Sequence, residues 1–313
     1  MNAPPTSKLV DWVVSAVGAP TKFAPCGWPQ GPSRVWRLDF SDAPSLYLKQ
    51  FGEERKREQE IAAFEWVDAL RDRGAALPTL RAMSDPDQKA IILTGVAGEV
   101  GTSFPLDEHD GVEVHRRAGA FLAAFHCLAF EDLDPMPLAH AIPLRLAFWI
   151  ERGGERLSCE EGALARDLVG DGSLFAGDRR VPCHRDYQLR NWLLEREAET
   201  AEGSGLALGV IDFEHARPDH PLVDFVRVEE RAAPHYPHWF EAFILGYEQA
   251  TFEQRTHERS PCTEVTLESI EEKLRAFSAI HAVGSVVWGH CHGDQKFERA
   301  GHELLSRLRV EYC

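Results

Sequence analysis

Two short apolar segments near the middle of the chain constrain the fold more than any other part of the sequence. Residues 181–194 read VPCHRDYQLRNWLL, and residues 206–213 read LALGVIDF. The polar stretch EREAETAEGSG joins them, which predicts two short strands that form a small hairpin. On both sides of this hairpin in the sequence, apolar residues recur at helical spacing. The segments are residues 115–130, 144–153, 161–170, 238–254 and 266–309. From about residue 112 onward, we therefore expect an α-rich region with a hairpin in its middle.

The first third of the chain has a different pattern. Residues 34–40 and 45–51 mostly alternate apolar with polar side chains around the turn sequence DAP, which predicts a β-hairpin. Residues 53–73 place apolar side chains on one stripe and charges opposite, which predicts a helix. A short strand is expected near Leu80, and the β-branched run AIIL at 90–93 predicts another.

Together these patterns predict an α+β chain of two domains. Residues 1–99 form a small, mostly β domain with one inserted helix. Its last residues, 94–99, read TGVAGE and form the expected hinge. Residues 100–313 form the larger, α-rich domain. A length of 313 residues is sufficient for two domains that each bury a core.

The segment from His184 to Asn191 carries the strongest chemical signal. It reads HRDYQLRN and is followed by IDF, which ends at Phe213. These are parts of a phosphoryl-transfer site, because such chemistry needs one carboxylate to orient the attacking hydroxyl and accept its proton. It also needs hard oxygen ligands for magnesium. Asp186 suits the first role, and Asn191 and Asp212 suit the second. His184 is expected to support the loop by hydrogen bonding.

A lysine and a carboxylate in the first domain complete the expected site. Lys49 lies in LYLKQF, on the second strand of the predicted hairpin. Glu60 lies on the next helix, on the same face as Phe64 and Val67, so its side chain is expected to point inward. A Lys–Glu pair of this kind would aim the lysine at nucleotide phosphates. Two solvated surface charges are the alternative reading.

The distribution of charged side chains along the chain limits the classes of molecule that we expect it to bind. Residues 1–99 carry 12 basic and 13 acidic side chains, whereas residues 100–313 carry 22 basic and 37 acidic ones. A surface this acidic repels phosphate backbones, so we expect no nucleic-acid partner. The acidic second domain would attract cations, although acidity can also serve solubility alone.

Hydropathy and cysteine content narrow the compartment. No apolar run approaches the length of a membrane helix, and the N-terminal residues lack a signal-peptide pattern, so we expect no membrane partner. The chain has 7 cysteines and no CxxC motif, which favours reduced thiols over a disulfide framework or a zinc ribbon. A cytoplasmic location is expected.

With these motifs, the sequence resembles the aminoglycoside phosphotransferase family, whose relatives include choline kinases and, more distantly, protein kinases. The resemblance runs through most of the chain: VPCHRDYQLRNWLL is similar to the catalytic loop of the family and VIDFEHARPDHPLVDF to its metal-binding strand. EIAAFEWV is similar to its lobe helix, with Glu60 at the lysine-pairing position. The resemblance implies a bilobal, protein-kinase-like fold, ATP or GTP as donor, Mg²⁺, and transfer to a small-molecule hydroxyl.

The resemblance also implies a nucleotide site in the first domain. IILTGVAGE is similar to the strand and hinge of the family, which implies hydrogen bonds from adenine to the backbone of Thr94 and Val96. The nucleotide loop departs from the glycine-rich pattern and reads CGWPQGPSR, so backbone amides from Gly31 to Ser33 would hold the phosphates.

Three positions near the catalytic segment leave alternatives open. Arg185 stands where the family often has glycine. Glu214 replaces the glycine of the DFG motif, and it is either a further metal contact or a solvent-facing residue. Asp224 is expected to brace the catalytic loop. The short interval from Glu214 to Asp224 leaves little room for the activation segment of a protein kinase.

We therefore expect an ATP-dependent O-phosphotransferase. Its acceptor is cationic or neutral, such as an aminoglycoside or an amino sugar. The alternative is a nucleotide-binding pseudoenzyme with the same fold, which the loss of Lys49, Asp186, Asn191 or Asp212 would favour; all four are present.

Overall fold

The computed structural model describes residues 4–27, 31, 33–72, 74–196, 205–232, 236–257 and 267–312. The chain divides into two compact units. Unit 1 comprises residues 1–110 and 189–217, and unit 2 comprises residues 111–188 and 218–313. Each unit is made of segments that are far apart in the sequence.

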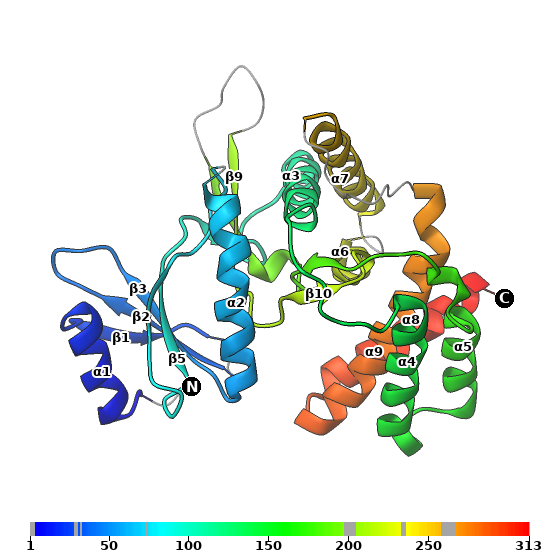
Figure 1. Cartoon of the computed structure of the whole chain (residues 1–313), viewed down its shortest axis with the longest axis horizontal. Coiled ribbons are helices and arrows are strands. Elements are labelled where there is room, and N and C mark those ends of the chain that lie inside the picture. The colour runs from blue at the N-terminus through cyan, green and yellow to red at the C-terminus, as the bar shows by residue number, and fades with distance from the viewer. Residues whose placement is uncertain are drawn as a thin grey trace. The chain divides into compact units, whose positions relative to one another are not determined.

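Unit 1 contains an antiparallel sheet with the strand order β1-β2-β3-β5-β4 (Figure 1). The predicted hairpin is confirmed, because β2 and β3 pair with Val35 opposite Lys49. The strand bounds are Lys22–Pro25 for β1, Arg34–Asp39 for β2, Leu46–Gln50 for β3, Leu80–Met83 for β4 and Ala90–Thr94 for β5.

A helix covers each face of this sheet (Figure 1). Helix α1 (Ser7–Val17) packs Leu9 and Val13 against Trp36, Leu48 and other side chains on one face. Since side chains alternate along a strand, Lys49 points to the opposite face, where helix α2 (Glu54–Arg71) lies. Alternation on β3 therefore aims Lys49 at α2.

A second sheet of unit 1 has the order β6-β8-β9. It consists of β6 (Glu99–Val100), β8 (Trp192–Arg196) and β9 (Leu206–Val210). Trp192 at the start of β8 pairs with Val210 at the end of β9, so the residues just outside these two positions also meet. The backbone N–H of Ile211 donates to the carbonyl of Asn191 over 3.0 Å.

Unit 2 is α-rich. Its helices are α3 (Glu108–His126), which begins in unit 1, α4 (Leu138–Gly153), α5 (Cys159–Val169), α6 (Leu222–Ala232), α7 (Pro237–His257), α8 (Leu267–His292) and α9 (Gln295–Tyr312). A short ladder pairs β7 (Val181–Cys183) with β10 (Arg217–Asp219). Among the described residues, no helix combines the length and apolarity needed to cross a bilayer.

Glycines allow α3 and α7 to approach closely. A Cβ placed on Gly119 would overlap the carbonyl oxygen of Phe243, and one on Gly246 would overlap the carbonyl oxygen of Arg116. Each helix thus contributes a glycine at which the backbone of the other is in contact.

The structure differs from the sequence predictions at several points. Residues 181–194 are not one strand, because β7 and β8 belong to different sheets with the 184–191 loop between them. A single boundary after residue 99 does not describe the two units either, since the β6–β8–β9 sheet places residues 100–110 and 189–217 in unit 1. Helix α1 and strands β1 and β10 are elements that the sequence patterns missed.

The cysteines are mostly, but not all, free thiols. Cys26, Cys159, Cys183 and Cys291 are free. Cys127 is disulfide-bonded, so the expectation of reduced thiols throughout is wrong. The absence of a CxxC motif argues only against local pairing, because a folded chain can also join cysteines that are distant in sequence.

Candidate functional site

In unit 1, the buried Lys49 lies among three carboxylates, of which Glu60 and Glu214 are buried and Asp212 is partly exposed. Its Nζ lies 2.7 Å from Oε2 of Glu60 and 3.2 Å from Oε2 of Glu214, and it also contacts Oδ1 of Asp212. Burial opposes the charge of Lys49, but these carboxylates together raise its pKa well above the ordinary value. The predicted Lys49–Glu60 pair is present, and both side chains are buried.

Burial also affects the partner of this lysine. It raises the pKa of Glu60 to about 7, against the opposing charge of Lys49. Glu58, only two residues earlier on α2, is exposed. The helical-face argument therefore distinguished the inward carboxylate from the outward one.

The β8–β9 pairing brings Asn191 and Asp212 to one end of the hairpin. Asn191 ends a 3-10 turn (Leu189–Asn191) directly before β8, and Asp212 follows β9. Asp212 has a φ of +70°, a left-handed conformation that is costly for a residue with a Cβ and that is often found at functional sites. An amide oxygen and a carboxylate at adjacent positions are the hard oxygen donors that Mg²⁺ takes, so these residues fit a magnesium ion.

Glu214 is buried, which excludes the solvent-facing alternative. Its Oε2 accepts a hydrogen bond of 2.6 Å from the hydroxyl of Ser33, and its Oε1 lies 2.8 Å from Nζ of Lys56. Burial works against its ionisation, but Lys49, His215 and Lys56 hold the pKa of Glu214 well below its ordinary value. Of the expected phosphate-binding residues Gly31 to Ser33, Ser33 is thus held by Glu214, and Pro32 lies outside the described residues.

The expected adenine contacts lie on the edge of the same unit. The N–H of Thr94 donates to the carbonyl of Thr79 over 2.9 Å, and Thr94 Oγ1 accepts from the N–H of Thr79. The backbone N–H of Thr94 is therefore not an available donor, because the carbonyl of Thr79 already accepts it. Val96 lies beyond the end of β5, and its side chain packs against Gly209.

Unit 2 holds the expected base. Asp186 is buried, and its Oδ1 accepts a hydrogen bond of 2.5 Å from the side-chain amide of Gln188. Nε of Arg227, on α6, lies 3.8 Å from the same oxygen. The guanidinium of Arg227 also lies over the ring of Phe297, 5.4 Å from its centroid. Arg227 thus places a cation beside this carboxylate.

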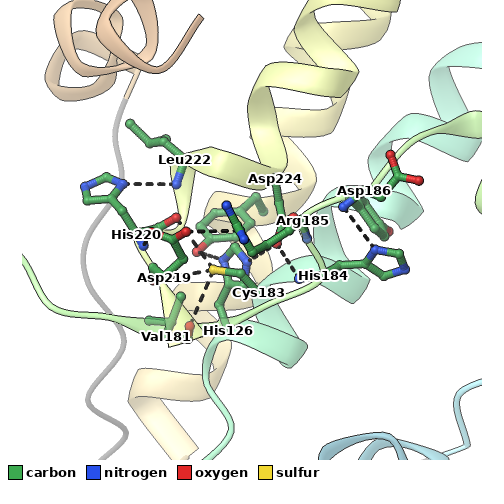
Figure 2. Close-up of polar contacts among 12 residues, drawn as sticks. His126, Val181, Cys183, His184, Arg185, Asp186, Asp219, His220, Leu222 and Asp224 are labelled. Carbon is green, nitrogen blue, oxygen red and sulfur yellow. Dashed lines mark hydrogen bonds and ion pairs between the residues drawn. The ribbon is translucent and has the colours of Figure 1, made fainter. Parts of the chain in front are cut away.

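Asp224 holds the backbone that leads to Asp186 (Figure 2). Its carboxylate accepts the backbone N–H groups of His184, at 2.8 Å, and of Arg185, and it lies 3.1 Å from Nε2 of His126. Arg185 has a φ of +65°, so Asp224 bonds the strained part of the loop. These contacts are those of the expected brace.

The side chain of Arg185 forms an ion pair within unit 2. Its Nε lies 3.0 Å from Oδ2 of Asp219, and Arg145 bonds the other oxygen of the same carboxylate over 2.8 Å. Burial opposes ionisation of Asp219, but Arg185 and Arg145 lower its pKa to about 2. Arg185 thus takes part in an internal ion-pair network of unit 2 (Figure 2).

The sequence analysis missed several residues of these networks. Lys56, Arg227, Asp219 and Arg145 were not singled out. The position of Lys56 could have predicted its place near Glu60, because it lies one helical turn before Glu60 on the same helix. Arg227 similarly lies three residues after Asp224 on α6.

Comparisons with known proteins place these networks in context. The sequence profile described as "Phosphotransferase enzyme family" (APH) matches residues 30–262. No curated protein sequence matches the chain at a significant level.

Solved structures match the chain over nearly its whole length. One is a choline kinase, LicA, from Streptococcus pneumoniae, at 14% identity and a TM-score of 0.64, with 96% of this chain and 98% of that chain covered. Another is the GDP and kanamycin complex of APH(2")-IIia, at 14% identity and a TM-score of 0.68, with coverages of 98% and 99%. A third is aminoglycoside phosphotransferase APH(4)-Ia with AMP-PNP and hygromycin B, at 13% identity and a TM-score of 0.64, with coverages of 97% and 98%.

At such identities the likeness concerns the fold alone. It confirms the predicted α+β fold of the kinase-like phosphotransferases, with a small N-terminal sheet and a helical C-terminal part.

Proposed function

Because the chain belongs to the phosphotransferase enzyme family, we propose that it transfers the γ-phosphate of ATP, bound with Mg²⁺, to a hydroxyl group of a small molecule. The observation that carries this proposal is the ion-pair network in which the buried Lys49 joins Glu60 to Asp212, with Asn191 at the adjacent end of the hairpin. Unit 1 thereby contains a cation that can bind phosphates. It also contains oxygen ligands that can bind a metal.

In this proposal the nucleotide binds in unit 1. Lys49, oriented by Glu60, neutralises the phosphates, and the Ser33 hydroxyl donates to a phosphate oxygen. The adenine ring of the nucleotide is held at the end of β5 by the carbonyl of Thr94 and the backbone of Val96. ATP is the proposed donor. GTP is the alternative, since one matched structure holds GDP and another holds AMP-PNP. A cytoplasmic location remains part of the proposal.

Asn191 and Asp212 are the proposed Mg²⁺ ligands. When bound, the ion neutralises the charge of the phosphate oxygens. The Asp212 carboxylate already contacts one cation, the Lys49 ammonium.

Asp186 is the proposed general base. It accepts the proton of the acceptor hydroxyl while the hydroxyl oxygen forms a bond to the γ-phosphorus, and the bond from that phosphorus to the β–γ bridging oxygen breaks, releasing ADP. The Gln188 amide and the Arg227 guanidinium orient its Oδ1.

The acceptor is proposed to be cationic or neutral and to bind in the α-rich part of residues 100–313, whereas residues 1–99, together with Asn191 and Asp212, serve the nucleotide. Support comes from the acidic excess of residues 100–313 and from the matched structures named for choline kinase, kanamycin and hygromycin B. Arg227 places a positive charge beside Asp186. Any cationic group of the acceptor is therefore expected to lie away from the hydroxyl that reacts.

Two substitutions test the division of roles. Asp212→Asn should abolish turnover and weaken Mg²⁺-dependent nucleotide binding, because it removes a metal ligand. Asp186→Asn should abolish turnover while nucleotide binding is retained, because it removes only the base. Binding is measured as thermal stabilisation by Mg-ATP or Mg-GTP, which is about 2.7 kcal/mol at a hundredfold excess over Kd.

The exposed Asp42, replaced by Asn, is the matched control and should change neither quantity. Turnover is followed as ATP consumption with aminoglycosides, amino sugars and amino alcohols. If neither nucleotide stabilised the wild-type protein, the proposed function would be wrong. If both variants lost nucleotide binding equally, the role given to Asp186 would be wrong.

A further inference from the structure

Glu214 gathers donors from three separate segments of unit 1. The hydroxyl of Ser33 precedes β2, Lys49 is on β3, and Lys56 is in the first turns of α2. All three donate to or pair with this one carboxylate, at 2.6 Å, 3.2 Å and 2.8 Å respectively. Nε2 of His215 also lies 3.4 Å from it.

This donor set is the kind that binds a phosphate group. A hydroxyl and two ammonium groups on one buried anion match the charge-assisted hydrogen bonds that phosphate oxygens form. Lys56 is the unexplained member, because the Lys49–Glu60 pair is complete without it. Its side chain is only 13% exposed, so its charge is directed into the network and not into solvent.

We propose that Lys56 is a second phosphate-binding lysine of the nucleotide site, and that Glu214 holds Ser33, Lys49 and Lys56 together until the nucleotide triphosphate replaces its carboxylate as their partner. This inference rests on the proposed function. It adds Lys56 to the nucleotide site. It also makes Glu214 a competitor of the nucleotide phosphates for the same donors.

The charges of the network imply that phosphate binding depends on metal binding. Lys49 and Lys56 face Glu60, Asp212 and Glu214, so the carboxylates outnumber the lysines by one. A divalent cation taken up by Asp212 reverses that sign. Phosphates then compete with Glu214 in a net positive setting, whereas without the metal they meet a net negative one. Triphosphate binding should therefore depend strongly on Mg²⁺.

Nucleotide titrations by calorimetry test the role of Lys56. Lys56→Met should weaken Mg-ATP binding about tenfold, the loss typical of one charged hydrogen bond. Lys56→Arg should retain most of the affinity, and adenosine, which has no phosphate, should bind all variants equally. The exposed Lys22, changed to Met, is the matched control for loss of a positive charge.

The competitor role of Glu214 makes the opposite prediction for ATP without metal. Glu214→Gln should strengthen metal-free ATP binding several-fold, because a neutral amide competes less well for the lysines. The exposed Glu58 of α2, changed to Gln, controls for the loss of a negative charge and should have no such effect.

The outcomes separate the possibilities. Unchanged Mg-ATP affinity in Lys56→Met, or equal losses for ATP and adenosine, would overturn the inference. Weaker metal-free ATP binding in Glu214→Gln would also overturn it, because Lys56 and Glu214 would then merely stabilise each other. Absence of nucleotide binding by the wild-type protein would instead contradict the proposed function itself.

Discussion

Asp224 lies 40 residues after His184 in the sequence, and its carboxylate bonds the backbone N–H groups of His184 and Arg185. The sequence motif indicated such a brace, because a buried carboxylate next to a strained loop is a recurrent solution. The motif did not indicate the partners of Arg185 or Asp186. Gln188 bonds Asp186 from only two residues away, whereas Asp219 and Arg227 reach Arg185 and Asp186 through tertiary packing, which residue spacing along the chain does not encode.

At the same scale, His115 makes the stability of the protein depend on pH. Its ring is buried on α3 against Trp239, with a centroid distance of 5.1 Å, and its Nδ1 lies 2.7 Å from the carbonyl of Gly111. Burial lowers the pKa of His115 from 6.5 to about 4. Between these values the unfolded chain binds the proton and the folded chain does not, so the free energy of unfolding rises with pH.

We expect the contribution of His115 to be complete above pH 6.5 and to be lost progressively as the pH falls toward 4, by up to about 3 kcal/mol. Urea unfolding at pH 4.5, 5.5 and 7 measures it. His115→Gln should flatten the pH profile between these points. An identical profile in the variant would show that His115 does not titrate in this way. His220 and His281, whose pKa values burial also lowers, should add to this slope, whereas Glu60, whose pKa burial raises to about 7, should oppose it.

At the scale of elements, the contact between α3 and α7 depends on glycine. Gly119→Ala should destabilise the protein by about 2 kcal/mol or more, because the new methyl group would overlap the carbonyl of Phe243. Gly162→Ala on α5 is the matched control, since a Cβ there would meet only the end of the Arg166 side chain, at 3.5 Å. The control should be neutral or stabilising by up to about 1 kcal/mol. Equal unfolding midpoints for the two variants would contradict this account of the contact.

The elements also show what periodicity can and cannot predict. The β2–β3 hairpin follows from alternation, the helix around Glu60 from an apolar stripe and the strand at 90–93 from a β-branched run, and the structure confirms all three. The segment 181–194 was predicted as one strand because its ends are both apolar. Its middle is a loop, since Asp224 and the β8–β9 pairing satisfy the backbone groups that a continuous strand would have paired elsewhere. Such competition between partners is a tertiary effect.

At the scale of the whole molecule, the net charge of −16 predicts how salt affects acceptor binding. A cationic acceptor should show a KM that rises with ionic strength, because salt screens its attraction to an acidic surface. The KM of a neutral acceptor should stay constant, which provides the control in the same assay. A salt-independent KM for the best cationic acceptor would leave the proposed charge preference without support.

The chain passes between the units at residues 110–111, 188–189 and 217–218. A ribosome adds about 5–20 residues per second and releases the chain from its N-terminus onward. The first 110 residues therefore emerge with the Lys49 strand and α2 but without Asn191, Asp212 and Glu214. For the time needed to make the next hundred or so residues, on the order of 5–20 seconds, the buried ammonium of Lys49 has only Glu60 among its final carboxylate partners. Unit 1 is thus a late product of translation, and a fragment ending at residue 110 would lack the carboxylates that surround Lys49.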